Sequence, residues 1–511
     1  MKMRPMMVLI AAGLVLQPAL VFAQTPAPAT TAPTNAAPTN AAPTNAAPTN
    51  AAPTNAAPAP STAGTLGTEP IQIQATTPPL PGAAIELKLQ TTKPLKLQDA
   101  IDIILANSPQ LKISALAVDR AEAVLRQARA GLFPTVALSG SYTYSQSAQG
   151  AVSNALVLQS SGGFGGSNQL FTSETVPVQG QIQVSYNVFT SGLVGSRILA
   201  ANENLQATRL DYERIRQDLI NTVIGSYYDL QAASGNVEIA QAAVRSGEAS
   251  LRDARAQEKA GVGTRFAVLQ ADVQLANAKQ QLLQSQNQSV INQRNLARQL
   301  NFSQPTTVEA ADVVEKGGTW EFSEEETIFQ ALNGRVELAQ QLAIERAAKA
   351  NEAVAYASVS PQISIFTAGQ AYDNLLDTVT GIYTGYNAGI QLQWNAFDGG
   401  SALAQADQAA DDAKTARIRY IDIRNTVRFS VENSLSTLNT ASLRIDTASA
   451  ALVSATEALR LARLRFQAGV GTQTDVINAD RDLTQARVNR LIAVIDYNRA
   501  LAAIRRSTGT L

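Results

Sequence analysis

Two stretches of the chain alternate strictly between apolar and polar residues. Residues 178–188 place valine, isoleucine, glycine and tyrosine at the even positions, and glutamine, serine and asparagine at the odd positions. Residues 386–396 show a similar alternation 208 positions later. A period of two predicts a β-strand with one apolar and one polar face. Weaker strand patterns follow Pro134 and Pro361, so the sequence predicts four strands in two pairs.

A longer period follows each strand pair. From Ile198 to Leu219 a large residue recurs every seven positions, and this heptad-like seam predicts a long, closely packed helix. The chain has no proline between residues 177 and 305, so nothing in that stretch interrupts a helix. At about 1.5 Å per residue, a helix from Gly192 to Gly261 would be roughly 100 Å long. An isolated coiled-coil rod would explain the helices but not the strands.

The pentapeptide AGVGT occurs twice, at residues 260–264 and 468–472, and the same offset of 208 aligns about 90 residues without a gap. Long helices impose such agreement, because one inserted residue turns the rest of a helix by about 100°. The glycines predict a tight reversal between an outgoing and a returning helix. We therefore expect a first structural repeat (95–302), a connector (303–322) and a second repeat (323–511), each repeat with two strands and one long helical hairpin.

The N-terminus has the pattern of an export signal. Lys2 and Arg4 precede a long apolar run, and small or apolar residues suit a cleavage site before Gln24. Residues 1–23 are therefore interpreted as a signal peptide, with a retained membrane anchor as the alternative. Residues 24–94 are rich in proline, alanine and threonine and contain five copies of APTNA. Regular proline opposes helix and strand, which predicts a disordered linker.

Composition removes most catalytic chemistry. The 511 residues include no cysteine and no histidine, which excludes disulfides, thiolate nucleophiles, imidazole bases and the usual zinc ligands. We expect no enzyme activity, no cofactor and no metal site. The formal net charge is −1, so the chain has no excess of positive charge that would favour binding to nucleic acid. An exported enzyme is the weakest alternative, since neither AGVGT ends in the Gly-Lys-Ser/Thr of a phosphate loop.

The predicted strands suit a membrane. Their polar face is neutral, and aromatic residues lie near their ends, at Tyr186, Phe189, Trp394 and Phe397. This pattern is typical of a transmembrane β-barrel with aromatic residues at the membrane interface. A soluble, half-buried sheet shows the same alternation and is the alternative. Four strands cannot close a barrel, so several chains would have to share one.

The arrangement resembles the TolC-type outer-membrane efflux proteins from about residue 95 to the C-terminus. The resemblance rests on VSYNVFTSG and LQWNAFDGG at the strand ends, the two AGVGT tips, and LKLQDAIDIILANSPQL and EETIFQALNGRVELAQ before the strand pairs. It implies an α+β membrane protein in which a homotrimer, with four strands per chain, forms one twelve-stranded β-barrel. A periplasmic α-helical coiled-coil tunnel would continue this barrel.

The resemblance also implies a function and partners. It predicts an outer-membrane channel with a long periplasmic extension, surrounded by outer-membrane lipid. This channel would be the passive exit duct of a tripartite efflux or type I secretion system for small toxic compounds, secreted proteins or both. Its partners would be a periplasmic adaptor (membrane fusion) protein and an inner-membrane pump of the ABC, RND or MFS type. A soluble periplasmic coiled-coil adaptor or scaffold is the alternative function.

The resemblance further implies a periplasmic gate near the second hairpin turn. Phe466 matches an aromatic position and Asp475 the first of two acidic positions, while Asn478 replaces the second and Ala267 stands at the equivalent of Asp475 in the first repeat. Asp475 can equally be a solvated carboxylate that interacts with the helix N-terminus. The residues expected to contact the adaptor are the hairpin tips Gly261, Val262, Gly263, Thr264, Gly469, Val470, Gly471 and Thr472.

Overall fold

The computed structural model describes residues 91–146, 174–302, 306–375 and 381–511, all within one of the two units into which the chain divides. The predicted signal peptide and the linker up to residue 90 lie outside the described residues.

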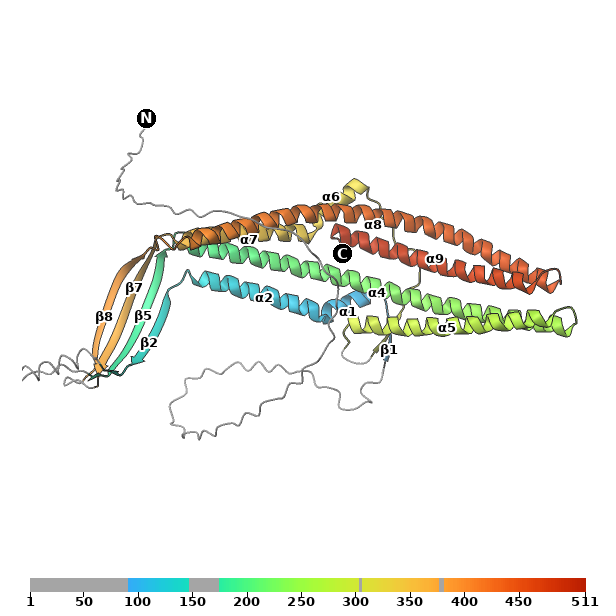
Figure 1. Cartoon of the computed structure of the whole chain (residues 1–511), viewed down its shortest axis with the longest axis horizontal. Coiled ribbons are helices and arrows are strands. Elements are labelled where there is room, and N and C mark those ends of the chain that lie inside the picture. The colour runs from blue at the N-terminus through green and yellow to red at the C-terminus, as the bar shows by residue number, and fades with distance from the viewer. Residues whose placement is uncertain (1–90, 147–173, 303–305, 376–380) are drawn as a thin grey trace, which may run out of the picture. The chain divides into compact units, whose positions relative to one another are not determined.

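Two long helical hairpins dominate the described part of the chain. Helix α4 spans Leu193–Lys259 and helix α8 spans Ser401–Gln467, each with 67 residues. Helix α5 (Arg265–Gln299) returns from α4, and helix α9 (Gln473–Thr508) returns from α8, so that the helices run side by side in Figure 1. Both α8 and α9 begin 208 positions after their counterparts, which confirms the predicted duplicated hairpins.

Two shorter helix pairs precede the strand pairs, and the periodicity did not predict them. Helices α1 (Leu97–Asn107) and α2 (Pro109–Ala130) come before the first strands, and α6 (Glu324–Gly334) and α7 (Val336–Ser358) before the second. The start of α2 has a local cause, because Ser108 accepts a hydrogen bond from a backbone N–H of the first turn and proline occupies the first position. In the described part of the chain, α2 and α7 pack against α4, and α7 also packs against α8.

A short parallel strand pair changes one predicted boundary. Strand β1 (Thr91–Leu95) pairs with strand β6 (Thr306–Ala310). The sequence predicts a linker that runs to residue 94, whereas the structure places residues 91–94 in β1. The partner strand lies more than 200 positions away in the predicted connector, and a local pattern cannot reveal such a pairing.

The four predicted strands form one antiparallel sheet. Its order is β2 (Thr135–Tyr142), β5 (Pro177–Phe189), β7 (Gln362–Asn374) and β8 (Tyr383–Gln393). The central pair, β5 and β7, joins the two repeats. Strand β8 begins and ends three residues earlier than the predicted range 386–396. The outer edges of β2 and β8 have no partner strand among the described residues.

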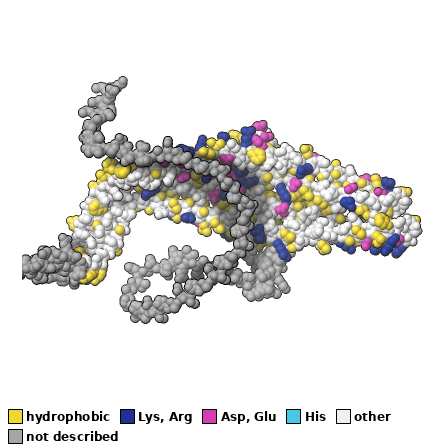
Figure 2. All heavy atoms as spheres, in the orientation of Figure 1, with side chains coloured by type: hydrophobic (Ala, Val, Ile, Leu, Met, Phe, Trp, Pro, Cys, Tyr) yellow, Lys and Arg dark blue, Asp and Glu magenta, His cyan; other side chains and the backbone are white. Residues whose placement is uncertain are grey.

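The sheet differs from the helices in charge. The four strands contain one charged residue, Asp373. Large apolar side chains are exposed on them, among them Leu138 at 83%, Tyr386 at 91% and Ile390 at 76%. Figure 2 shows the Lys, Arg, Asp and Glu side chains over the helices and hardly any over the strands. A sheet with this surface suits the apolar interior of a membrane.

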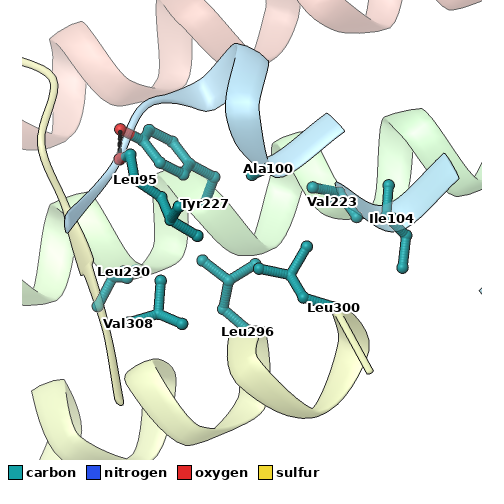
Figure 3. Packing of buried hydrophobic residues seen from close by; sticks show 9 residues of the cluster. All are labelled: Leu95, Ala100, Ile104, Val223, Tyr227, Leu230, Leu296, Leu300 and Val308. Carbon is teal, nitrogen blue, oxygen red and sulfur yellow. Dashed lines mark hydrogen bonds between the residues drawn. The ribbon is translucent and has the colours of Figure 1, made fainter. Parts of the chain in front are cut away.

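One buried apolar cluster of the described residues combines residues of β1 and β6 with residues of the neighbouring helices. Tyr227 and Leu230 of α4 pack there against Leu296 of α5 and Ile104 of α1 (Figure 3). The Tyr227 hydroxyl donates to the backbone oxygen of Leu95 at 3.0 Å. This cluster therefore fixes the N-terminal strand and helix against the middle of the first hairpin.

Candidate gate at the hairpin tips

The two predicted tips have the same backbone geometry. Gly261 and Gly469 have φ angles of 74° and 75°, a left-handed conformation that favours glycine. Gly263 serves a different purpose, since a Cβ atom at this position would lie 2.8 Å from the Cβ of Gln257. Its counterpart Gly471 is similarly close to the end of α8. One glycine of each pentapeptide therefore provides the turn, and the other permits close approach.

Each tip exposes the valine between its two glycines and the threonine after them. Val262 and Val470 are 75% and 71% exposed. Thr264 and Thr472 cap the returning helices α5 and α9, each accepting a hydrogen bond from a backbone N–H three residues further on. The eight predicted tip residues thus form two short, capped turns at the same end of the hairpins, as Figure 1 shows.

Asp475 lies on the surface at the start of α9. Its backbone N–H donates to the Thr472 hydroxyl at 3.2 Å, and its Oδ2 accepts from the Thr472 backbone N–H at 2.9 Å. The backbone N–H of Thr472 in the first place, and its side-chain hydroxyl in the second, lower the pKa of the Asp475 carboxyl below its ordinary value. The carboxylate is therefore ionised at neutral pH and held by the helix cap.

The other two predicted gate residues lie in different surroundings. Asn478 is exposed on α9. Phe466 is only 6% exposed and packs in an apolar cluster with Leu251, Leu459 and Val476. The Phe466 ring therefore stabilises the contact between the hairpins, and it is its backbone oxygen that takes part in polar contacts.

Three glutamines join the two hairpins near the tips, and the sequence did not single them out. Gln257 Nε2 donates to the Phe466 backbone oxygen at 2.6 Å. Gln473 Nε2 donates to Ser250 Oγ at 2.7 Å, and Gln467 Nε2 donates to an oxygen of Asp253 at 3.2 Å. Each bond connects α4 of the first repeat with α8 or α9 of the second. These bonds, which we call the tip contacts, hold the hairpins together.

A partly buried polar cluster lies next to the tip contacts, on the side away from the turns. Ser246 of α4 donates to Asp480 of α9 and accepts from Arg463 of α8, while Arg463 Nη2 lies 3.9 Å from Asp480 Oδ1. Burial raises the pKa of Asp480, and the Ser246 hydrogen bond and the Arg463 charge counteract part of this effect. The sequence could not show that Asp480 is buried, because the same residue type stands at the equivalent position of the first repeat, Asp272, and is exposed there.

The predicted interface aromatics lie where the strands lead into the long helices. Tyr186 and Phe189 belong to the last part of β5, and Trp394 and Phe397 follow β8 directly. All four are exposed, and Trp394 Nε1 also donates to the backbone oxygen of Val359 at 3.1 Å. These four aromatic rings therefore lie at the end of the sheet that leads into the long helices, and Tyr186 and Trp394 also carry a polar group there.

Within the described residues, no group of acidic side chains is placed to hold a metal ion. No helix of the same part of the chain is long and apolar enough to cross a membrane.

A nearly uncharged sheet that continues into two long hairpins defines the fold of an outer-membrane channel subunit. The sequence matches the family described as "Outer membrane efflux protein" over residues 100–301 and 327–510, and the chain belongs to this family. Membership assigns the chain to the outer membrane, and it supports a channel rather than a soluble adaptor.

Relatives and solved structures agree with this assignment. The chain is 27% identical over 183 residues to "Outer membrane protein TolC" of Escherichia coli (strain K12), a match that covers 35% of each protein. It is 25% identical over 334 residues to "Pyoverdine export outer membrane protein OpmQ" of Pseudomonas aeruginosa, covering 63% of this chain and 69% of OpmQ. The matched part thus spans about a third of the length of TolC.

The fold is similar to that of solved channels at low sequence identity. The outer membrane protein VceC from Vibrio cholerae superposes with a TM-score of 0.66 at 18% identity, over 81% of this chain and 96% of VceC. The Campylobacter jejuni CmeC outer membrane channel gives 0.68 at 18% identity, over 81% of this chain and 85% of CmeC.

Proposed function

We propose that three copies of this chain form the exit duct of a tripartite efflux or type I secretion system. The observation that carries the proposal is the sheet β2-β5-β7-β8, which exposes apolar side chains and whose two outer edges have no partner strand in the described part of the chain. A sheet in a bilayer has to pair its edges, because the lipid offers no hydrogen-bond partners. Three such sheets would close one twelve-stranded barrel, and the hairpins would continue it as a periplasmic tunnel.

The partners follow from the family assignment and from the tips. We assign contact with a periplasmic adaptor to the two exposed tips, because Val262 and Val470 present apolar side chains there on rigid, capped turns. The adaptor would connect the duct to an ABC, RND or MFS pump in the inner membrane. The cargo would be small toxic compounds, secreted proteins or both, and the duct would conduct them passively.

Fractionation and deletion test this function. We expect a trimer that only detergent extracts from the outer membrane, and a deletion strain that becomes sensitive to toxic compounds, fails to secrete a protein, or both. Recovery of a monomer from the soluble periplasmic fraction would refute the duct and support an adaptor or scaffold. Normal drug resistance and normal secretion in the deletion strain would refute the transport role.

We also propose that the tips form the gate and that Asp475 gives it selectivity. Three exposed, ionised carboxylates around a pore would favour cations and bind multivalent cations that block it. Asn478 at the second expected position makes this ring less acidic. Single-channel recordings should show weaker cation preference and weaker block for Asp475→Asn. The variant Thr472→Ala removes the helix cap but keeps the charge, so equal effects of both variants would refute a role of the charge.

A further inference from the structure

A cavity of about 490 Å³ lies within one chain, between helices α4 and α9 and next to the connector that joins the two repeats. Residues of α4, α8 and α9 line it, together with connector residues between Ala310 and Val314. Cavities of about 300–1,000 Å³ are typical of sites that bind small molecules. The proposed passive duct gives this cavity no role.

The register of α4 and α9 sets the order of the residues along the cavity. A Cβ atom on Gly235 of α4 would lie 2.7 Å from a side-chain carbon of Leu491 on α9, so these two residues face each other. Helix α4 runs toward the tips and α9 runs away from them. Gln231 and Arg490 therefore lie on opposite sides of this contact, about 8 Å apart along the helices at about 1.5 Å per residue.

The end of the cavity that is nearer the tips carries an excess of positive charge. Arg487 and Arg490 of α9 line this end, and neither forms an ion pair or a side-chain hydrogen bond with another residue of the described part of the chain. Glu238 of α4 lines the cavity at the level of Arg487 and is exposed. Two guanidinium groups against one carboxylate favour an anionic group of a ligand at this end.

The opposite end of the cavity offers hydrogen-bond acceptors. Asp312 lines it, and the Asp312 Oδ2 accepts from the Leu97 backbone N–H at 2.8 Å, which fixes the carboxylate there. Gln231 is only 4% exposed, and its Nε2 donates to the Asp312 backbone oxygen at 2.8 Å. The Gln231 Oε1 has no hydrogen-bond partner among the described residues. Because a buried acceptor without a partner is costly, this end favours an amino group or another donor.

Apolar side chains complete the walls of the cavity, among them Leu452 of α8 and Leu491 and Val494 of α9. We propose that the cavity binds a small zwitterion that has an apolar body and the length of a dipeptide. Its carboxylate lies at the two arginines of α9, and its ammonium group lies at Gln231 and Asp312. Two extended residues span about 7 Å, which is close to the separation of Gln231 and Arg490 along the helices.

Isothermal titration calorimetry of the full-length protein in detergent tests the site, with the dipeptide leucyl-leucine as the probe. We expect saturable binding of one peptide per chain. Two analogues test the two ends, since 4-methylpentanoyl-leucine lacks the ammonium group and leucyl-leucinamide lacks the carboxylate. Each analogue should bind about 10-fold more weakly or worse, because hydrogen bonds between charged groups are stronger than those between neutral groups.

Substitutions of the arginines test the carboxylate end. The double variant Arg487→Gln with Arg490→Gln should bind leucyl-leucine about 10-fold more weakly, yet bind leucyl-leucinamide at least as well as the unchanged protein does. General damage to the fold would weaken both peptides. The matched control is Arg120→Gln with Arg481→Gln, which changes two exposed arginines outside the cavity and should leave binding unchanged.

Three results would overturn the proposal. The first is the absence of saturable leucyl-leucine binding to the unchanged protein. The second is equal affinity for leucyl-leucine and its two analogues, which would show that neither charged end is recognised. The third is an equal loss of affinity in the two double variants, which would show that the arginines of the cavity do not hold the carboxylate.

Discussion

The tip contacts allow a quantitative test of the proposed gate. In the variant Gln257→Ala with Gln473→Ala, the hydrogen bonds of 2.6 Å and 2.7 Å between the hairpins are lost. A neutral hydrogen bond contributes about 0.5–1.5 kcal/mol net, so the loss amounts to about 1–3 kcal/mol for each copy. If the contacts exist only in the closed tunnel, this loss shifts the equilibrium toward separated hairpins by about 5- to 150-fold per copy.

Planar-bilayer recordings measure this shift. We expect a higher conductance or a higher open probability for the double variant than for the unchanged protein. The matched control is Gln485→Ala, because Gln485 Nε2 donates at 2.8 Å to Asn489 on the same helix, α9, and this bond does not join the hairpins. The control should conduct like the unchanged protein.

Two results would refute the reasoning. If the double variant forms a normal trimer with unchanged conductance, the tip contacts do not restrict the pore. If Gln485→Ala raises the conductance as much as the double variant does, the effect is a general loosening of the helices. Circular dichroism and native mass spectrometry establish that each variant is folded and trimeric before its conductance is compared.

Three further predictions concern stability. Burial gives Asp480 a pKa above its ordinary value of 3.8, so the folded state binds a proton more readily than the unfolded state does. The stability of the protein therefore falls as the pH rises through that raised pKa. Asp480→Asn should remove this part of the pH dependence of Tm. Tyr227→Phe removes a hydroxyl that donates to the Leu95 backbone oxygen at 3.0 Å or to Asp312 Oδ2 at 2.8 Å and accepts from the Asp312 backbone N–H at 3.3 Å, and it should cost about 1–3 kcal/mol in thermal unfolding. Tyr228→Phe should change stability little. Gly263→Ala would force a contact of 2.8 Å and should increase proteolysis at the first tip, while Gly195→Ala, with no atom within 4 Å of the new Cβ, should not.

The sequence predicts the long helices well because geometry constrains them strongly. A hairpin that packs along its whole length does not tolerate insertions, so the offset of 208 places the starts of α8 and α9 correctly. The alternating stretches likewise place β5 within one residue at each end, between Pro177 and Phe189. Both the periodicity and the repeat can be recognised in a single sequence.

The shorter elements required signals of another kind. Ser323 accepts a hydrogen bond from the backbone N–H of Glu326, and the Glu326 side chain accepts from the Ser323 backbone, a capping box that is readable as Ser-x-x-Glu. This signal could have predicted the start of α6. By contrast, the pairing of β1 with β6 depends on two five-residue segments far apart in the chain, and neither has a pattern that specifies its partner.

The polar contacts near the tips could not be predicted from the repeat, because identical residues at equivalent positions of the two repeats have different surroundings. Asp272 and Asp480 are the same residue at equivalent positions, yet only Asp480 is buried by another hairpin of its own chain. The alignment of the repeats therefore predicts the fold, but it does not predict which of two equivalent residues another helix covers.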